Sequence, residues 1–391
     1  MAPVGTDRPP LPGLTRFLVV TVVHDAELMT VGPDEAVVTF RADGDEPVTT
    51  RVGDAEVVTT GPYHSARVDG LEAGTEYTLD VEGAAPSEWL PPSFMTLERP
   101  AGRLLATVAT ANDVHFGEVE CGRIGDLGEE ELGPILRAEP GEAPYPEVMN
   151  RAVIDEMRAV DPDAVVVKGD LTDSGRESEL ESFLDAYGSL GARMQWVRGN
   201  HDVMTDPHFA DGEAPFPVHV DGITLAVVDT VVPGSDRGQL SADQVGWLDE
   251  LAGSVTNPVL VFGHHHLWNL DADHRSGTYF GINPDDSEAL AAVVNRRENI
   301  VGYLAGHTHR NRVRRFAAAR EVPFVEVACT KDYPGAWGEY RVYEGGYTQV
   351  VRRATAPAAM AWTEKTRRMF AGLYRDYALG PLGDRCFTES F

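Results

Sequence analysis

The sequence is organised around one short polar stretch, Gly199-Asn200-His201-Asp202, which follows an apolar run over residues 194–197. Such a short apolar run is typical of a buried strand. In open α/β sheets, ligands bind beyond the carboxyl ends of the strands. An amide, an imidazole and a carboxylate placed together at a strand end therefore predict a functional site. The surrounding chain has to form a sheet that supports it.

Four further polar clusters follow apolar runs in the same way. They are Asp113-Val114-His115, Gly169-Asp170, Gly263-His264 and Gly306-His307-Thr308-His309. Carboxylate oxygens suit hard divalent metal ions, and imidazole nitrogens suit borderline ones. A carboxylate can bridge two ions about 3.5–4 Å apart, the spacing that serves displacement at phosphorus. Because no cysteine belongs to these clusters, we expect a centre for two metal ions rather than a structural zinc site.

The N-terminal part of the chain has the pattern of a separate all-β unit. Residues 1–14 are rich in proline, and we expect them to form a loose tail. Short β-branched runs divided by turns, the first over residues 17–23, predict a β-sandwich over residues 15–99. A leucine, a Gly-Thr turn and Tyr77 at the start of the next alternating run resemble the tyrosine corner of a fibronectin type III-like domain.

From residue 104 onward, strands alternate with helices, which is typical of an α/β domain. We expect this domain to cover residues 100–354, with a C-terminal helix and tail over residues 355–391. The segment 117–144 has no periodicity and is longer than ordinary connections. Because it leaves directly from the Asp113 cluster, we predict that it forms part of the pocket wall. A weaker hypothesis also places the segment 384–391 near the site.

Charge and cysteine content narrow the range of partners and compartments. The net charge of −29 repels long polyanions, so nucleic acids and anionic membranes are not expected as partners. No apolar run reaches the roughly 18 residues of a membrane helix, and the N-terminus does not resemble a signal peptide. The cysteines are odd in number and widely spaced, which favours free thiols in a reducing compartment. Together these features predict a soluble cytoplasmic protein and leave its oligomeric state open.

The five clusters resemble the signature of the calcineurin-like metallophosphoesterase family. That signature is Asp-x-His, Gly-Asp, Gly-Asn-His-(Asp/Glu), a lone His and Gly-His-x-His, and all five blocks occur in this order over residues 104–351. The resemblance implies an α/β fold, a four-layer α/β/β/α sandwich, here preceded by a small all-β immunoglobulin-like domain. It also implies hydrolysis of a small phosphoester by a hydroxide that bridges two divalent ions, either Mn, Fe, Zn or Co.

The resemblance assigns seven metal ligands to two sets that share one carboxylate. The first ion would be bound by Asp113, His115 and His309. The second would be bound by Asn200, His264 and His307, and Asp170 would bridge both ions. In the run His264-His265-His266, the last histidine stands where the family usually has proline. His264 is therefore the expected ligand, with a neighbouring histidine as the alternative.

The same resemblance implies two catalytic residues. His201 would face the substrate, stabilise the phosphoryl oxygens and protonate the leaving group. Asp202 would orient His201. For Asp173, which follows Asp170 in the same loop, we expect a cap or hydrogen bond that stabilises the loop, with metal or substrate binding as the alternative. Ion pairing rather than phosphate binding is expected for the arginines Arg176, Arg198 and Arg237.

Three functions remain to be compared. Family members with this motif set resemble cyclic-nucleotide phosphodiesterases, which makes 3′,5′-cyclic AMP the best single prediction for the substrate. A phosphomonoesterase related to purple acid phosphatases is the alternative, because those enzymes also carry a β-sandwich before the catalytic domain. Their iron-binding tyrosine, however, is replaced here by Asp173. A non-catalytic binding protein is the least favoured reading, and hydrolysis of any phosphoester by the metal-loaded protein would exclude it.

Overall fold

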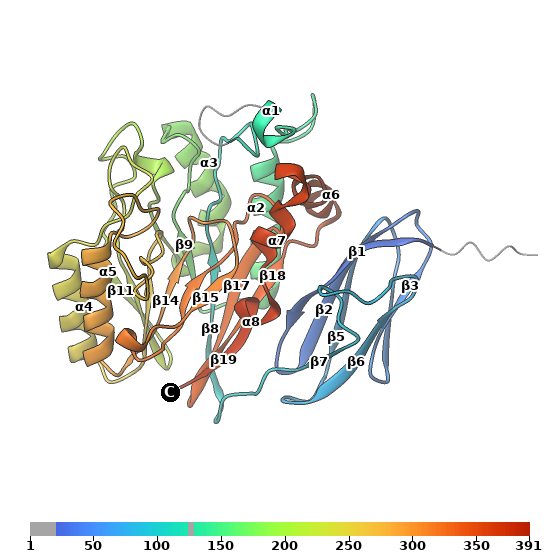
Figure 1. Ribbon diagram of the computed structural model, residues 1–391, viewed down its shortest axis with the longest axis horizontal. Coiled ribbons are helices and arrows are strands. Elements are labelled where there is room, and N and C mark those ends of the chain that lie inside the picture. The colour runs from blue at the N-terminus through green and yellow to red at the C-terminus, as the bar shows by residue number, and fades with distance from the viewer. Residues whose placement is uncertain (1–20, 124–128) are drawn as a thin grey trace, which may run out of the picture.

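A computed structural model describes residues 21–123 and 129–391 of the chain (Figure 1). The expected tail over residues 1–14 and most of the strand predicted over residues 17–23 lie outside the described residues. The first described strand, β1, begins at Val23. Within the described part of the chain, no helix has both the length and the apolar character needed to cross a bilayer.

The N-terminal unit is the predicted β-sandwich. One sheet has the order β1 (Val23–Val31), β2 (Glu35–Ala42) and β5 (Tyr63–Asp69). The other has the order β4 (Ala55–Thr59), β3 (Val48–Val52), β6 (Glu76–Val81) and β7 (Ser93–Met95). The hydroxyl of Tyr77 accepts a 2.9 Å hydrogen bond from the backbone N–H of Glu72, the contact expected of a tyrosine corner. The closer likeness to fibronectin type III stays a prediction.

The α/β part contains two six-stranded sheets. The first has the order β10 (Met194–Val197), β9 (Ala164–Lys168), β8 (Leu104–Ala111), β17 (Ala336–Tyr343), β18 (Gly346–Arg353) and β19 (Cys386–Ser390). The second has the order β11 (Phe216–Val220), β12 (Ile223–Val227), β13 (Val259–Phe262), β14 (Ile300–Ala305), β16 (Phe324–Glu326) and β15 (Arg312–Arg314). Strands β8, β9 and β10 run parallel, as do β12, β13, β14 and β16.

Alternating side chains show that the two sheets face each other. Leu260 and Phe262 of β13 belong to the core cluster shared with the first sheet, whereas Val259 and Val261 belong to a second cluster on the opposite face. Helices α4 (Ala242–Ser254) and α5 (Pro284–Arg296) pack into this second cluster. Helices α2 (Tyr145–Val160) and α3 (Glu177–Tyr187) pack into the first. The four-layer α/β/β/α prediction is therefore confirmed.

Short helices complete the chain. They are α1 (Glu129–Leu132), α6 (Pro357–Thr366), α7 (Tyr374–Leu379) and α8 (Leu382–Arg385), with 3₁₀ turns η1 (Gly188–Arg193), η2 (His201–Val203), η3 (Ala317–Ala319) and η4 (Phe370–Gly372). The C-terminal helix expected within residues 355–391 is interrupted at Phe370 and Ala371, whose φ angles of +54° and +55° no right-handed helix can accommodate. The segment expected as a tail ends in β19, which pairs with β18 at the edge of the first sheet.

The β-sandwich packs against the C-terminal part of the first sheet and against helices α6 to α8 (Figure 1). Thr30 of β1 donates a 2.6 Å hydrogen bond to the carbonyl of Val351 in β18. Arg385 donates to the carbonyls of Leu28 and Met29. Because these contacts join segments more than 300 residues apart, the interface is a product of the tertiary fold.

Candidate metal centre

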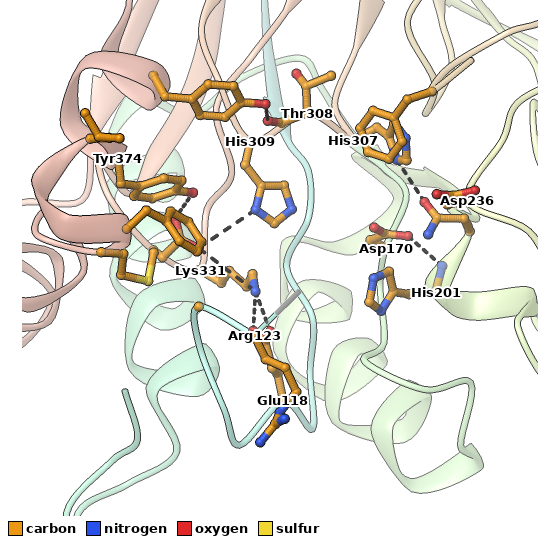
Figure 2. Close-up of a pocket in the computed structure, with 18 residues that line it drawn as sticks. Glu118, Arg123, Asp170, His201, Asp236, His307, Thr308, His309, Lys331 and Tyr374 are labelled. Carbon is orange, nitrogen blue, oxygen red and sulfur yellow. Dashed lines mark hydrogen bonds and ion pairs between the residues drawn. The ribbon is translucent and has the colours of Figure 1, made fainter. Parts of the chain in front are cut away.

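All five polar clusters lie on loops that follow the carboxyl ends of β8, β9, β10, β13 and β14. Parallel strands bring their carboxyl ends to the same edge of a sheet, and the two sheets face each other. The clusters therefore meet in one place although they span residues 113–309, and Figure 2 shows Asp170, His201, His307 and His309 of this group at the pocket. The structure brings together all seven residues that were predicted as metal ligands.

The first set consists of Asp113, His115 and His309. One potential ligand atom from each residue lies within 4.8 Å of the others. His309 Nε2 is 3.4 Å from Asp113 Oδ1. Asp113 and His115 are completely buried, whereas His309 is partly exposed at the floor of a pocket. This set has the composition expected for the first ion.

The second set is arranged around the side-chain oxygen of Asn200. His264 Nε2 lies 3.0 Å from Asn200 Oδ1, and His307 Nδ1 lies 2.9 Å from the same oxygen. The other ring nitrogen of His264 donates a 2.8 Å hydrogen bond to the carbonyl of Lys168. A carbonyl can only accept, so Nδ1 carries a proton and Nε2 is the nitrogen that faces the site.

Asp170 lies between the two sets. Its Oδ2 is 3.5 Å from His115 Nε2, and its Oδ1 is 3.4 Å from His264 Nε2. Each carboxylate oxygen thus faces a different set, which is the arrangement that a bridging ligand requires. The backbone N–H of His201 also donates to Oδ1 at 2.9 Å and holds the carboxylate in this orientation.

The donor set fits divalent metal ions. Two atoms bound to one ion at about 2.1 Å lie about 3.0–3.4 Å apart, close to the separations between these donors. Both ring nitrogens of His115 are buried without a hydrogen-bond partner, although buried polar atoms are normally paired. An ion that binds one of these nitrogens would remove part of this cost. Whether each residue binds a metal ion stays a prediction.

The loops of the metal centre have an unusual backbone geometry, with glycines at close approaches and left-handed φ angles at several of the predicted ligands. A Cβ added at Gly199 would lie 2.2 Å from Asp170 Oδ1, and one at Gly306 would lie 2.6 Å from Asp113 Oδ2. These glycines allow backbone to approach the ligands closely. Positive φ angles, which are costly for side chains with a Cβ, occur at Asp113, His115, Asp170, His307 and His309.

The prediction that Asp202 orients His201 is wrong. His201 Nδ1 instead donates a 2.7 Å hydrogen bond to the carbonyl of Asp173. The buried Asp202 carboxylate accepts from the backbone N–H groups of Gly199, Leu171 and Thr172, and from the Thr172 hydroxyl. Asp202 therefore ties the two loops that carry Asp170 and His201 to each other. Sequence alone could not show this, because its partners are mainly backbone groups.

Burial and mutual charge set the ionisation of these groups. Burial raises the pKa of Asp170, but the imidazoles of His264 and His201 outweigh burial and hold this pKa well below its usual value. Burial and the negative charge of Asp170 raise the pKa of Asp202 to about 6. Burial and the nearby Lys331 ammonium keep the pKa of His115 well below its usual value. His115 is therefore held neutral, the form in which imidazole binds metal ions.

The contacts of His264, His265 and His266 indicate which of the three faces the donor sets. Only His264 contacts both Asn200 and Asp170 in the way described above. The Nδ1 atom of His265 lies 2.9 Å from the hydroxyl of Thr230, although His265 also lies close to His307. His266 packs beside Phe280. The geometry thus favours the expected register.

The site opens into a pocket of about 600 Å³. Glu118, Gly122 and Arg123 line it, so the first residues of the 117–144 segment do form part of the wall. No residue of the segment 384–391 is among the lining residues of this pocket, so the proximity of that segment to the site stays a prediction. Two of the three arginines considered for phosphate binding form ion pairs, Arg176 with Glu179 and Arg198 with Asp229 and Asp211.

The sequence prediction missed several pocket residues. Lys331 is buried and forms an ion pair with Glu118 near the pocket floor (Figure 2). Asp332 accepts hydrogen bonds from Tyr374 and Cys329, and its Oδ2 lies 3.8 Å from His309 Nδ1. One signal was available, because lysine occurs at only three positions in this chain. Nothing in the local pattern placed Lys331 beside the Asp113 loop.

Comparison with known proteins gives one family match. The model of the calcineurin-like phosphoesterase family matches residues 106–311, just over half of the 391 residues. This region contains all five clusters and ends directly after His309 and Arg310. It excludes the β-sandwich and the C-terminal helices.

Curated relatives share this region at modest identity. A cAMP/cGMP dual specificity phosphodiesterase of Mycobacterium tuberculosis is 34% identical over 160 residues, which cover 38% of this chain and 49% of the relative. A probable cyclic nucleotide phosphodiesterase of a Synechococcus species is 27% identical over 163 residues, covering 41% and 62%. A glycerophosphodiester phosphodiesterase of Enterobacter lignolyticus is 28% identical, covering 38% and 56%. The chain spans about half the length of the curated relatives it matches.

A solved structure resembles part of this chain in its fold. A dimetal phosphatase from Danio rerio is 13% identical, with a TM-score of 0.49, and the match covers 64% of this chain and 97% of that one. A likeness of this size carries no argument about function.

Proposed function

Because this chain belongs to the calcineurin-like phosphoesterase family, we propose that it hydrolyses a small phosphodiester at a centre for two divalent metal ions. The best candidate substrate is 3′,5′-cyclic AMP. The observation that carries the proposal is the position of Asp170, whose two oxygens face two separate sets of His, Asp and Asn donors. His201 lies beside these sets, at the pocket.

The proposed roles of the site residues follow from their contacts. Two divalent ions held by the two donor sets would supply Lewis acidity and an activated water for attack on phosphorus. His201 donates through Nδ1 to the Asp173 carbonyl, which leaves Nε2 as the nitrogen available to a phosphoryl or leaving-group oxygen. Asp202 holds the loops of Asp170 and His201 at a fixed spacing. The mixture of carboxylate, imidazole and amide donors suits Mn, Fe, Zn or Co, and we propose that the two ions are drawn from these four metals.

A small diester is supported by three observations. The curated relatives bear names of cyclic-nucleotide and glycerophosphodiester phosphodiesterases, and both names refer to diesters. The pocket volume of about 600 Å³ suits a small molecule. The net charge of −29 disfavours long polyanions such as DNA or RNA.

The three cysteines are buried free thiols, and the cytoplasmic location stays a prediction.

A phosphomonoesterase related to purple acid phosphatases is the second candidate. The β-sandwich before the catalytic domain favours it. The position where those enzymes carry an iron-binding tyrosine is occupied here by Asp173, whose carbonyl is used to hold His201. A site with this residue cannot form the same iron–tyrosine bond, so the diesterase is preferred.

The decisive assay compares three substrates on manganese-reconstituted protein: bis-p-nitrophenyl phosphate, p-nitrophenyl phosphate and cyclic AMP. We expect the diester and cyclic AMP to be cleaved faster than the monoester. In His201→Ala, kcat should fall by about 100-fold or more while two metal ions per chain are retained. Preference for the monoester would favour the phosphatase. Absence of any cleavage with two ions bound would leave a binding protein.

A further inference from the structure

One wall of the pocket comes from outside the region that matches the family. Residues 369–377, between α6 and the end of α7, contribute Met369, Phe370, Leu373, Tyr374 and Tyr377 to the pocket lining. The family match ends at residue 311. The role of this wall therefore has to be inferred from its own chemistry.

The wall is apolar and aromatic, and part of it is exposed. Leu373 is 70% exposed and Tyr377 is 44% exposed. The ring of Tyr374, which is buried, is 5.6 Å from that of Phe370 and 6.2 Å from that of Tyr377, so the three rings pack in a row along the pocket. Exposed apolar surface inside a pocket is characteristic of a binding site, because a ligand that covers it removes it from water.

The wall is fixed relative to the candidate metal centre. The Tyr377 hydroxyl donates a 2.7 Å hydrogen bond to the carbonyl of Thr308, which lies between two predicted ligands. The Tyr374 hydroxyl donates to Asp332, whose carboxylate lies near His309 (Figure 2). A phosphoester whose phosphorus lies at the metal centre would place a substituent within reach of these rings.

The β-sandwich is hydrogen-bonded to the wall and to a second segment of the pocket. Glu27 of β1 is completely buried and accepts hydrogen bonds from Arg367 at 2.5 and 2.9 Å, from Arg375 at 2.9 Å and from Tyr333 at 2.7 Å. Arg367 lies two residues before Met369, Arg375 lies within the wall, and Tyr333 follows Lys331 and Asp332 of the pocket. One carboxylate of the sandwich thus anchors two segments that line the site.

The wall needs such an anchor because its backbone is strained. Phe370 and Ala371 both have left-handed backbone angles, which are unfavourable for residues with a Cβ. Conformations of this kind persist only where the surrounding contacts enforce them. The Glu27 contacts on either side of this turn provide that enforcement.

We propose that residues 369–377 form a specificity wall for a planar group of the phosphodiester, such as a nucleobase or aryl ring, and that Glu27 of the β-sandwich is the positioning residue that holds this wall. The inference rests on the proposed phosphodiesterase function. It also assigns the β-sandwich a role, namely to shape the substrate pocket from a distance.

The test uses two diesters with the same leaving group, phenyl p-nitrophenyl phosphate and methyl p-nitrophenyl phosphate, and the full-length manganese-loaded protein. The wild type should have a KM about fivefold lower for the phenyl ester, because only that ester carries a ring on the substituent that is not the leaving group, where it can pack on the wall. Leu373→Ser and Glu27→Gln should each remove most of this difference. Their kcat values and their KM for the methyl ester should stay within about twofold of wild type.

Two further variants keep the test decisive. If Glu27→Gln fails to fold, Arg375→Gln removes one of the same hydrogen bonds from a partly exposed position, and Arg375→Lys should restore part of the selectivity. Glu56→Gln, which loses an exposed ion pair with Arg51 in the same sandwich, is the matched control and should not change selectivity. An equal rise in KM for both esters, or an unchanged ratio of the two KM values in every wall variant, would overturn the proposal.

A binding measurement separates this inference from the proposed function. Calorimetry with phenylphosphonate and methylphosphonate reports on the wall without hydrolysis. If neither diester is cleaved but phenylphosphonate binds more tightly in wild type than in Leu373→Ser, the phosphodiesterase proposal fails and the wall is supported. If both phosphonates bind equally in both proteins, the wall is refuted, whatever the protein hydrolyses.

Discussion

Buried charged groups gather in two regions of this protein, and they are paired differently. At the interface between the β-sandwich and the α/β part, Glu27 and Glu35 are both fully buried and surrounded by arginines. At the candidate metal centre, Asp113 and Asp170 are equally buried, and no arginine or lysine is paired with either among the described residues. Their close neighbours are imidazoles, including one whose nitrogens have no partner.

The difference separates a structural use of buried charge from a functional one. A buried carboxylate costs free energy unless opposite charge or hydrogen bonds compensate for it. At the interface, arginines provide this compensation within the chain. At the metal centre, imidazoles compensate for the charge of Asp170, and most of these imidazoles belong to predicted metal ligands. Substitutions should therefore affect stability in the first region and metal binding in the second.

Asp170→Ala should have the largest effect. Loss of the carboxylate that faces both donor sets should lower kcat/KM on bis-p-nitrophenyl phosphate by about 10,000-fold or more. Metal content, measured by elemental analysis, should fall below two ions per chain. The melting temperature of the metal-free protein should change less than in Glu27→Ala, since Asp170 has no arginine partner and loses only its contacts with imidazoles and a backbone N–H. Asp211→Ala, an exposed carboxylate, is the control. Full metal content in Asp170→Ala would contradict the assignment.

Glu27→Ala should reverse this pattern. Removing one partner of a buried ion-pair network leaves the arginines uncompensated, which costs about 3–5 kcal/mol. Denaturant unfolding should detect this loss, while the variant still binds two ions per chain in the cold. Glu56→Ala, in an exposed pair on the same sandwich, should cost less than about 1 kcal/mol. Equal stability of the two variants would show that Glu27 is not a structural anchor.

The candidate site was predictable because its information is local. Each cluster is recognisable from a few residues after one strand, and the parallel arrangement of the strands then brings the clusters together. The predicted sandwich, the four layers and the convergence of seven residues from Asp113 to His309 all follow from such short patterns. The exception within the site is Asp202, whose partners are mainly backbone N–H groups that no residue pattern specifies.

The interface and the pocket wall were not predictable for the opposite reason. Glu27 and Arg367 are separated by 340 residues, and neither differs in sequence from an ordinary surface residue. The left-handed turn at Phe370 interrupts what the sequence indicates as a continuous helix. Such features depend on contacts between domains, and a pattern read along the chain contains no information about them.

Asp202→Ala tests a residue that shares one feature with each of the two regions. Asp202 lies within the site but is fully hydrogen-bonded, like the interface carboxylates. We expect the loss of its bonds to cost about 2–3 kcal/mol of stability, measured by denaturant unfolding. Two ions per chain should still bind at saturating manganese, because its oxygens face the loops and not the donor sets. Loss of metal binding from a folded variant would show instead that Asp202, like Asp170, contributes to metal binding. Asp206→Ala, an exposed carboxylate after the same turn, is the control.

The smallest predicted effect is the pH dependence of the interface. Burial raises the pKa of Glu35, but hydrogen bonding and charge from Arg352 and Arg341 outweigh burial and lower it from 4.5 to about 2. A lowered pKa means that this carboxylate stabilises the fold above pH 4.5 and loses that contribution as pH falls towards 2. The stability advantage of wild type over Glu35→Gln should therefore shrink by about 1 kcal/mol between pH 7 and pH 3.5, in denaturant unfolding at both values. An advantage that is independent of pH would show that Glu35 is not held ionised by its arginines, and the contrast with the metal centre would lose its electrostatic basis.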